Sequence, residues 1–278
     1  MAAHKHFKSS VLIFDLQKNS ISDYLNNLGS NFNGGIDSQL ISVSEFNLIS
    51  KKLEKNNIKI IPFRNSPLNK NYYPDFNKSY SFSLPKSHIP RQFKKNLSWV
   101  RKSIKAEGLL IWNNAHIAYL LNIRSFELEN STKPFAGLFI FKNNKKPIII
   151  SNDNCLKEII KIQNNFLIVS NDEFVGHLSK QKINSIELDY KYNNLFNYLS
   201  LEKICKIQNS KIDLDKFISK KTTVEFNNIC LAHKEDGLSL TKFILKIKQN
   251  MKLYSDEYSF IDELYNLRKE GINFFRNS

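Results

Sequence analysis

Short apolar runs alternate with helix-like segments through the middle of this 278-residue sequence, and this alternation constrains the fold more than any other feature. Runs such as "LLIW" at 109–112 and "PIIIS" at 147–151 have the length and continuous apolar character of buried strands. Between such runs lie segments with helical spacing, one of which has apolar residues at intervals of four, three and four: Phe93, Leu97, Val100 and Ile104. Alternating strands and helices predict an α/β fold with mixed sheets.

The other elements of this middle region follow from the same patterns. We expect helices at 114–122, 156–162, 174–178 and 195–204, and strands at 135–141, 166–170 and 185–188. The tight connection "KNNKK" between two of the strands predicts a hairpin.

The region before residue 58 predicts one strand, one turn and one helix. "SSVLIFDL" at 9–16 has the apolar character of a buried strand, whereas Gly34 and Gly35 are typical of a turn. Ser42 or Ser44 is a suitable N-cap for the helix-like stretch that follows.

Two stretches lack a clear period and predict linkers. The first, 64–85, follows a short predicted strand at 58–63 and contains three prolines. The second, 208–223, precedes a long helical segment.

Two helices are predicted at the end of the sequence. The first is long, and its expected buried positions are Val224, Leu231, Leu238, Phe243, Ile244 and Ile247. The second has Ser255 as its expected N-cap, and Gly271 is its expected stop.

The formal net charge of +15 at pH 7 raises the question of a nucleic-acid partner. Lysine, which lacks the bidentate fork suited to phosphates and guanine edges, is scattered along the whole chain. Only six of the 41 basic residues are arginine, namely Arg64, Arg91, Arg101, Arg124, Arg268 and Arg276. A coding bias towards Lys, Asn and Ile explains this charge, so we expect no nucleic-acid partner. In the absence of a basic amphipathic helix, we also expect no membrane partner.

The cysteines and the lengths of the apolar runs indicate the cellular compartment of the protein. Cys155, Cys205 and Cys230 are isolated and odd in number, so they predict neither a disulfide framework nor a Cys-x-x-Cys metal site. The opening residues lack the pattern of a secretory signal, and the longest apolar runs fall short of the roughly 20 residues that span a bilayer. We therefore expect a soluble, cytoplasmic protein.

Four stretches, taken in order, resemble the Xaa-Pro aminopeptidases of the creatinase and prolidase superfamily. "IAYLLNIRSFELENSTKPFAGLFIF" at 117–141 resembles a segment in which an apolar helix ends in Leu-Asn-Ile/Leu-Arg-Gly, before a proline and an aromatic strand. "KKTTVEFNNICLAHKEDGLSLTKFI" at 220–244 and "SDEYSFIDELYNLRKEGINFF" at 255–275 resemble the first helices of the catalytic domain. "SSVLIFDLQ" and "GGIDSQLIS" are similar, more weakly, to the late part of the first domain in the three-domain members.

The resemblance implies creatinase-like N-terminal domains with mixed sheets, followed by an incomplete "pita-bread" α+β segment. The implied domains are a partial first N-terminal domain with its linker at 1–82, a second N-terminal domain at 83–215, and a truncated start of the metallopeptidase domain at 216–278. Ser125 and Glu127 depart from the family pattern, which has glycine and aspartate there.

Members of this family cleave the bond before proline with two divalent metal ions, typically manganese. The ligands are two aspartates, one histidine and two glutamates, all downstream of the helix that ends here at Gly271. None of the five can be placed in this sequence. The resemblance therefore implies no catalytic, cofactor-binding or metal-ligating residue in this chain, and no cofactor.

The histidines give no better candidates for a metal centre. We expect His4 and His6 in a frayed terminus, His88 at the surface and His116 in helix packing, whereas His177 has no acidic partner at ligand spacing.

The two sharpest features are expected to be structural. His233 and Asp236 are three residues apart, so they share a helix face and can interact there. Arg124 follows the apolar helix, where a cation can meet unpaired carbonyl groups, and we favour that role over catalysis or ligand binding.

The expected function is that of a truncated Xaa-Pro aminopeptidase-like protein without peptidase activity of its own. The alternative is the non-catalytic half of a split metalloaminopeptidase that binds a separately encoded catalytic chain. Self-association through helix faces left without partners, around Phe243, Ile247, Ile261 and Leu264, is also expected. A basic nucleic-acid-binding protein is the third and least favoured interpretation.

Overall fold

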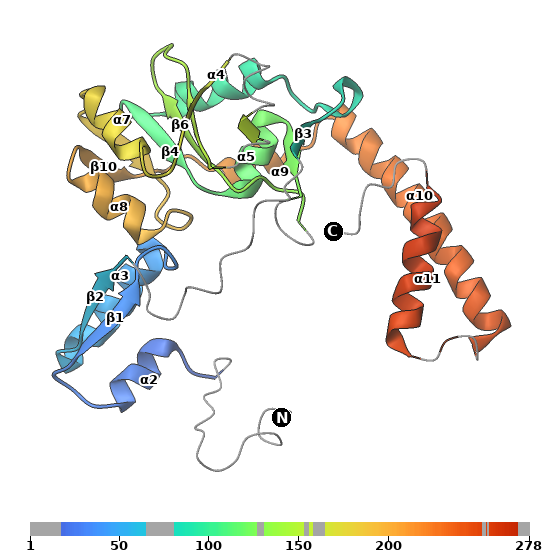
Figure 1. Ribbon diagram of the computed structural model, residues 1–278, viewed down its shortest axis with the longest axis horizontal. Helices are drawn as coiled ribbons and strands as arrows, with labels where there is room; N and C mark the ends of the chain where they lie inside the picture. Colours follow the sequence, from blue (N-terminus) through green and yellow to red (C-terminus); the bar gives the residue numbers. More distant parts are fainter. Residues whose placement is uncertain are drawn as a thin grey trace. The chain divides into compact units, whose positions relative to one another are not determined.

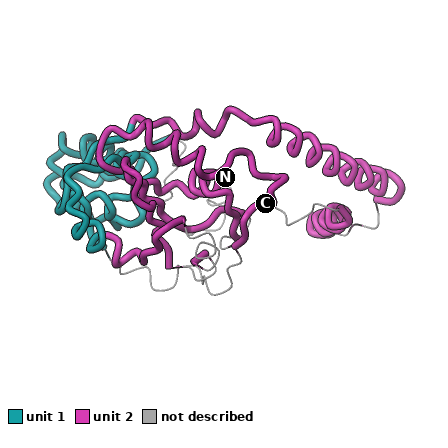
Figure 2. Tube along the Cα trace, turned by 90° about the horizontal axis from the view of Figure 1, so that it is seen from above, with its two compact units in different colours: residues 1–73, 175–210 teal, residues 74–174, 211–278 magenta. Residues whose placement is uncertain are grey.

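The computed structural model describes residues 18–64, 81–126, 131–152, 156–157, 165–251, 254 and 256–271. They fall into two compact units that are interleaved along the chain (Figure 2). Unit 1 comprises residues 1–73 and 175–210, and unit 2 comprises residues 74–174 and 211–278. Because neither unit is continuous in sequence, the division into domains 1–82, 83–215 and 216–278 stays a prediction.

Unit 1 begins with helices that carry their own start signals. Helix α2 (Ile21–Asn27) begins at a capping box formed by Ser20 and Asp23, and α3 (Val43–Leu53) begins at one formed by Ser42 and Glu45. Ser42 is therefore the N-cap of α3. The short 3₁₀ helix η1 (Glu54–Asn56) ends at Asn57, whose φ of 54° turns the chain into the next strand.

Strand β1 (Asn33–Asp37) corrects the expectation of a turn at Gly34 and Gly35. It pairs in parallel with β2 (Lys59–Phe63). A Cβ on Gly35 would lie 2.9 Å from the ring of Phe63, and one on Gly34 would lie 3.0 Å from Ile60. The glycines are needed here for close approach within a sheet, which local sequence does not distinguish from a turn.

The later part of unit 1 packs on the earlier part. It contains most of α7 (Phe174–Lys180), the parallel pair β9 (Ser185–Leu188) and β10 (Lys206–Asn209), and α8 (Leu195–Glu202). The backbone N–H of Leu195 donates to Ile41 O and that of Phe196 donates to Ser38 O, both at 2.9 Å. The Arg64 guanidinium lies over the Phe196 ring at 4.8 Å.

Unit 2 contains a mixed sheet region in which the strand order is β4-β6-β7-β8. Strands β4 and β6 are labelled in Figure 1. Strand β4 (Gly108–Ile111) is antiparallel to β6 (Gly137–Phe141), which is antiparallel to β7 (Ile148–Ile150), and β7 is parallel to β8 (Leu167–Val169). The predicted hairpin and the predicted α/β class with mixed sheets are both confirmed.

Two helices cover the core of this sheet region. Helix α4 (Phe93–Ser103) contributes Leu97 and Val100, and α5 (Asn114–Leu121) contributes Ile117 and Leu120. They share one apolar cluster with side chains of the strands, including Leu138 and Ile149, both fully buried. The spacing that predicted α4 is thus the spacing of its buried face.

The predicted linkers contain more structure than expected. Strand β3 (Ser81–Ser83) lies inside the first linker, 64–85, and the 3₁₀ helix η3 (Lys86–His88) follows directly after it. Strand β3 pairs with β5 (Ile123–Ser125), which was not predicted. Helix α9 (Leu214–Ser219) lies inside the second linker, 208–223, and begins at the side chain of Asp213. These elements are shorter than the windows in which periodicity can be recognised.

The last two helices form an antiparallel hairpin within unit 2. Helix α10 (Thr223–Gln249) has 27 residues and begins at a capping box of Thr222 and Glu225, and α11 (Glu257–Lys269) begins at Asp256. The expected cap Ser255 lies outside the described residues, as do the expected strand at 9–16 and most of the expected helix at 156–162.

The expected buried positions of α10 are largely wrong. Val224 is 37% exposed, Leu231 56%, Leu238 60% and Ile244 43%, whereas Phe243 and Ile247 are partly buried. Their helical spacing is correct, but no described part of the chain covers this face.

Candidate functional site

Arg124 makes the helix-end contacts that its position predicts. Its side chain lies on β5, and its Nη1 donates to Ala118 O at 3.1 Å and to Ile123 O at 2.9 Å. Ala118 belongs to α5, so the guanidinium meets carbonyl groups near the end of this helix. Burial lowers the pKa of Arg124, and the negative charge of Glu225 opposes that shift. The arginine stays a cation in this setting because its ordinary pKa is so high.

The turn between α5 and β5 depends on the asparagine that precedes this arginine by two positions. Asn122 caps α5 with φ 55°, a left-handed conformation that asparagine tolerates better than most residues. Its Nδ2 also donates to Arg91 O at 2.9 Å. The guanidinium of Arg91 lies 4.6 Å from the centre of the Phe217 ring, which also stacks on Trp99 at 3.9 Å. Asn122 therefore links the turn to the segment that carries Arg91.

Glu225, at the start of α10, lies next to Tyr119 and Arg124. It accepts hydrogen bonds from the backbone and hydroxyl of Thr222, and the hydroxyl of Tyr119 donates to it at 3.5 Å. Burial, followed by the charge of Glu225, raises the pKa of Tyr119, so this phenol stays protonated at neutral pH. The cluster of Arg124, Tyr119 and Glu225 contains one carboxylate and suits helix positioning rather than catalysis.

Sequence inspection missed Tyr119 and Glu225 as members of this cluster. The Thr-x-x-Glu pattern at Thr222 and Glu225 is a recognisable capping signal, and it could have located the start of α10. The contact of Glu225 with Tyr119 joins residues 106 positions apart, which no local pattern reveals.

His116 is buried, so the packing role expected for it is correct. It also contacts a second helix. Its Nε2 lies 2.8 Å from Asp215 Oδ1, which links α5 to α9. The side chain of Asp215 is 62% exposed, so the carboxylate is solvated on one side while the imidazole is covered. Asp215 lies in a predicted linker and was not a candidate.

The expected interaction of His233 with Asp236 is not formed. His233 is exposed, and Asp236 Oδ1 instead accepts from Arg268 Nε of α11 at 2.6 Å. The partner lies 32 residues away, so tertiary packing has overridden the local spacing.

The remaining candidates are placed as follows. His88 is at the surface, as expected, with Nδ1 2.9 Å from Ser87 Oγ, and His177 is partly buried. Cys205 and Cys230 are free thiols. His4, His6 and Cys155 lie outside the described residues.

No group of three or more His, Cys, Asp or Glu side chains that could hold a metal ion occurs in the described part of the chain. The donors present there, such as the His116–Asp215 pair, do not fit a two-metal centre, which needs several carboxylates converging on the ions. Among the described helices, none is both long and apolar enough to cross a membrane.

Known proteins resemble this chain in structure. No family model and no curated protein matches its sequence. The X-prolyl aminopeptidase of Caenorhabditis elegans matches its structure with a TM-score of 0.77 at 14% identity, over 97% of this chain and 45% of that one. That protein is described as a cytosolic enzyme with a di-nuclear active site.

Two bacterial structures match less well. The Xaa-Pro dipeptidase of Bacillus anthracis gives a TM-score of 0.46 at 13% identity, over 64% of this chain and 49% of that one. The creatinase/prolidase N-terminal domain of an X-Pro dipeptidase from Streptococcus pyogenes gives 0.31 at 14% identity, over 41% of this chain and 98% of that domain. Of these three matches, only the one to the nematode enzyme is close enough to support a conclusion about the fold. The chain has the fold predicted from its resemblance to Xaa-Pro aminopeptidases, and it spans less than half the length of that enzyme.

Proposed function

We propose that this chain supplies the non-catalytic part of an Xaa-Pro aminopeptidase-like enzyme, together with the first two helices of the catalytic domain. The observation that carries the proposal is the structural match over 97% of this chain and 45% of the nematode enzyme. In this proposal residues 1–82 and 83–215 are the two creatinase-like N-terminal domains, and residues 216–278 begin the metallopeptidase domain. The protein works in the cytoplasm.

The proposal includes the absence of peptidase activity from residues 1–278 alone. Two-metal hydrolysis needs a cluster of carboxylate and imidazole ligands, and the described residues bring no such cluster together. The cluster of Arg124, Tyr119 and Glu225 would then serve to orient the start of α10, the helix that leads into the catalytic domain.

The outer face of α10 supports the alternative in which a separately encoded catalytic chain completes the fold. Val224, Leu231, Leu238 and Leu245 recur every seven residues, so they lie along one face of the helix. We call them the leucine stripe. All four are exposed, from 37% at Val224 to 60% at Leu238. Exposed apolar side chains along one helix face favour association with a partner or with a second copy of the chain.

The patches expected around four other residues are only partly open. Ile261 is 59% exposed, but Leu264 and Ile247 are partly buried. The ring of Phe243 packs edge-on against Tyr254 and Phe260, at 6.4 and 6.2 Å. The hairpin therefore covers its inner face and leaves the leucine stripe open.

An assay of the purified chain tests the first part of the proposal. A peptide with proline in the second position is incubated with the chain, with and without Mn²⁺, and release of the first residue is measured. We expect no metal-dependent release, whereas an intact Xaa-Pro aminopeptidase in the same assay releases it. Metal-dependent release that is removed by a chelator and scales with the concentration of this chain would overturn the proposal.

Binding to a catalytic chain tests the alternative. The nucleotides following this reading frame are searched for a frame that encodes the five metal ligands, and the two chains are co-expressed. We expect a complex with metal-dependent activity, and we expect Leu231→Asp with Leu238→Asp to abolish it. The matched control is Leu40→Asp, at a residue of unit 1 that is 69% exposed. A complex that survives the stripe variant would rule out α10 as the interface.

A further inference from the structure

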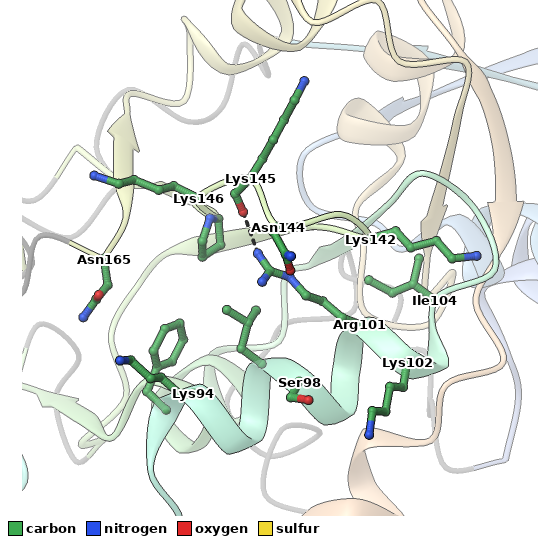
Figure 3. A pocket seen from close by; sticks show the side chains of 13 residues that line it. Lys94, Ser98, Arg101, Lys102, Ile104, Lys142, Asn144, Lys145, Lys146 and Asn165 are labelled. Atoms are coloured by element: carbon green, nitrogen blue, oxygen red, sulfur yellow. Dashed lines mark hydrogen bonds between the residues drawn. The ribbon is translucent and has the colours of Figure 1, made fainter.

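A basic pocket lies between α4 and the turn that joins β6 to β7 (Figure 3). Its volume is about 630 Å³, within the usual range for small-molecule sites. Its floor is apolar and includes the buried side chains of Leu97, Ile104 and Pro147. Six cationic side chains line it: Lys94, Arg101, Lys102, Lys142, Lys145 and Lys146.

The charge of this pocket exceeds what the lysine-rich composition explains. Six of its 13 lining residues are basic, against 41 of 278 in the whole chain. None of the described residues that line it is acidic, although the chain contains 26 acidic residues. A random sample of this surface would mix both signs, so the pocket is a local concentration of positive charge.

Arg101 gives the pocket a fixed centre. Its Nε donates to Phe141 O at 3.1 Å and its Nη2 donates to Lys145 O at 2.5 Å, which anchors the guanidinium to the β6–β7 turn. A guanidinium has five N–H donors, so three remain after these two bonds. In Figure 3 the guanidinium lies in the middle of the pocket.

The lysines around this centre are spread apart. Figure 3 shows Lys94 and Lys146 extending to the same side, next to Asn165, whereas Lys102, Lys142 and Lys145 point away from one another. A compact ligand with several negative charges would attract these flexible side chains inward.

We propose that this pocket binds an oligophosphate group, either free or carried by a nucleotide. Oligophosphate concentrates its charges within a few ångströms, which matches cations gathered around one cavity. An extended acidic peptide spaces the carboxylates on one face by roughly 7 Å, which matches a groove better than a pocket. Lysine is a common phosphate ligand because it acts as a flexible point charge.

We expect the pocket to recognise the phosphate chain of a nucleotide and not its base. The one aromatic side chain among the described lining residues is Phe93, whose ring packs on Phe166 with centroids 4.6 Å apart. A stacking platform for a base needs an open aromatic face. Free tripolyphosphate and ATP are therefore expected to bind with similar affinity.

Titration calorimetry on the whole chain tests the proposal at about 50 mM salt and again at about 150 mM, where screening is stronger. The probes are tripolyphosphate, ATP, adenosine and a ten-residue glutamate peptide. We expect tripolyphosphate and ATP to agree within about threefold, the peptide to bind at least about tenfold more weakly, and adenosine not to bind. The higher salt should weaken the first two.

A charge-matched pair of variants locates the site. Lys94→Gln with Lys146→Gln should weaken tripolyphosphate about tenfold or more, whereas Lys94→Arg with Lys146→Arg, which keeps the charges, should bind within about threefold of the original chain. The control is Lys234→Gln with Lys248→Gln on α10, which removes the same charge elsewhere and should change affinity less than about twofold. Circular dichroism checks that all three variants fold.

Four results would overturn the proposal. They are no binding of tripolyphosphate at about 1 mM, binding of ATP without binding of tripolyphosphate, binding of the glutamate peptide as tight as that of tripolyphosphate, and equal weakening by the pocket variant and the α10 control. The third result would replace the ligand class with an acidic peptide. The fourth would assign the affinity to net charge. None of these results depends on peptidase activity, so the proposed function is tested separately.

Discussion

The sheet region and the α10–α11 hairpin belong to the same unit and use apolar residues at comparable spacing, yet they bury them to very different degrees. In the sheet region Val100, Ile117 and Phe139 are fully buried. Along α10 the leucine stripe is exposed, and the buried position is Ser239, whose hydroxyl donates to Glu235 O and Leu267 O. Amphipathic spacing thus specifies a helix face, but a packing partner decides whether that face is buried.

The two regions can be observed separately. Both tryptophans, Trp99 and Trp112, lie in the sheet region, so tryptophan fluorescence reports on that region alone. Circular dichroism at 222 nm reports on all helices, including the 27 residues of α10 and the 13 of α11. A helical hairpin with few buried apolar contacts should open at lower free energy than the sheet region.

Removing a large side chain from each region should give the largest contrast. Phe139 is fully buried, and its ring packs against Phe141 and Phe174 at 5.0 and 5.9 Å. Phe139→Ala should lower the free energy of unfolding by about 3–5 kcal/mol, because it leaves a cavity. Leu238→Ala should change it by less than about 0.5 kcal/mol, because that side chain is exposed. Urea denaturation followed by tryptophan fluorescence measures the first change, and circular dichroism at 222 nm measures the second. Equal losses would show that the leucine stripe is covered in solution.

A methyl group added to one glycine in each region should have effects of opposite sign. A Cβ on Gly137 would lie 2.2 Å from the Trp112 ring, so Gly137→Ala should destabilise the sheet region by about 1–3 kcal/mol. A Cβ on Gly237 meets no atom within 4 Å, so Gly237→Ala should stabilise α10 by about 0.5–1 kcal/mol through helix propensity. Fluorescence should detect the first and circular dichroism the second. Destabilisation by Gly237→Ala would mean that another surface packs closely there.

The ion pair within the hairpin should contribute less. Arg268 and Asp236 join α10 to α11, with side chains 32% and 47% exposed. Asp236→Asn should reduce hairpin stability by about 0.5–1 kcal/mol, because solvent screens a pair this exposed. Asp262→Asn, at an exposed position of α11, is the control. Thermal unfolding followed at 222 nm should show an earlier hairpin transition in the first variant only, with fluorescence unchanged in both.

Alkaline pH should weaken one ion pair of the hairpin, and this should be the smallest effect. The hydrogen bond to Glu263 raises the pKa of Lys246 above its ordinary 10.5. This interaction stabilises the hairpin fully below the unfolded pKa, and the stabilisation is lost as pH rises through the higher folded value. Helix signal that declines above pH 10.5 should therefore decline less in Lys246→Gln than in the original chain, whereas Lys248→Gln should behave like the original chain. Identical pH profiles of the two variants and the original chain would show that the Lys246–Glu263 pair does not contribute to hairpin stability.

Periodicity recovered the helices and strands that are long or fully apolar. The face of α4, the β6–β7 hairpin and a cap at Ser42 or Ser44 were all predicted, because each depends on residues close in sequence. The strand at Gly34 was missed because a glycine pair that allows close approach in a sheet looks like a turn. The pairing of Asp236 was missed because its partner is 32 residues away.

In the candidate site too, contacts between residues close in sequence were predicted, and contacts between distant segments were missed. The contact of Arg124 with helix-end carbonyls was predicted from its place after α5, a local relation. Its neighbours Tyr119 and Glu225 come from distant segments, and the basic pocket joins α4 to a turn some 40 residues later. Tertiary clusters of charge need the fold before they can be recognised, even when each lysine is visible in the sequence.

The guanidinium contacts suggest how this chain has absorbed a bias towards lysine. Every arginine that the structure describes uses its planar group: Arg64 and Arg91 over phenylalanine rings, Arg101 and Arg124 on pairs of carbonyls, Arg268 on a carboxylate. An ammonium lacks the planar group that stacks on a ring or forks onto oxygen acceptors. The few arginines thus mark the positions at which replacement by lysine keeps the charge and loses the contact, and substitution elsewhere on the basic surface is correspondingly cheap.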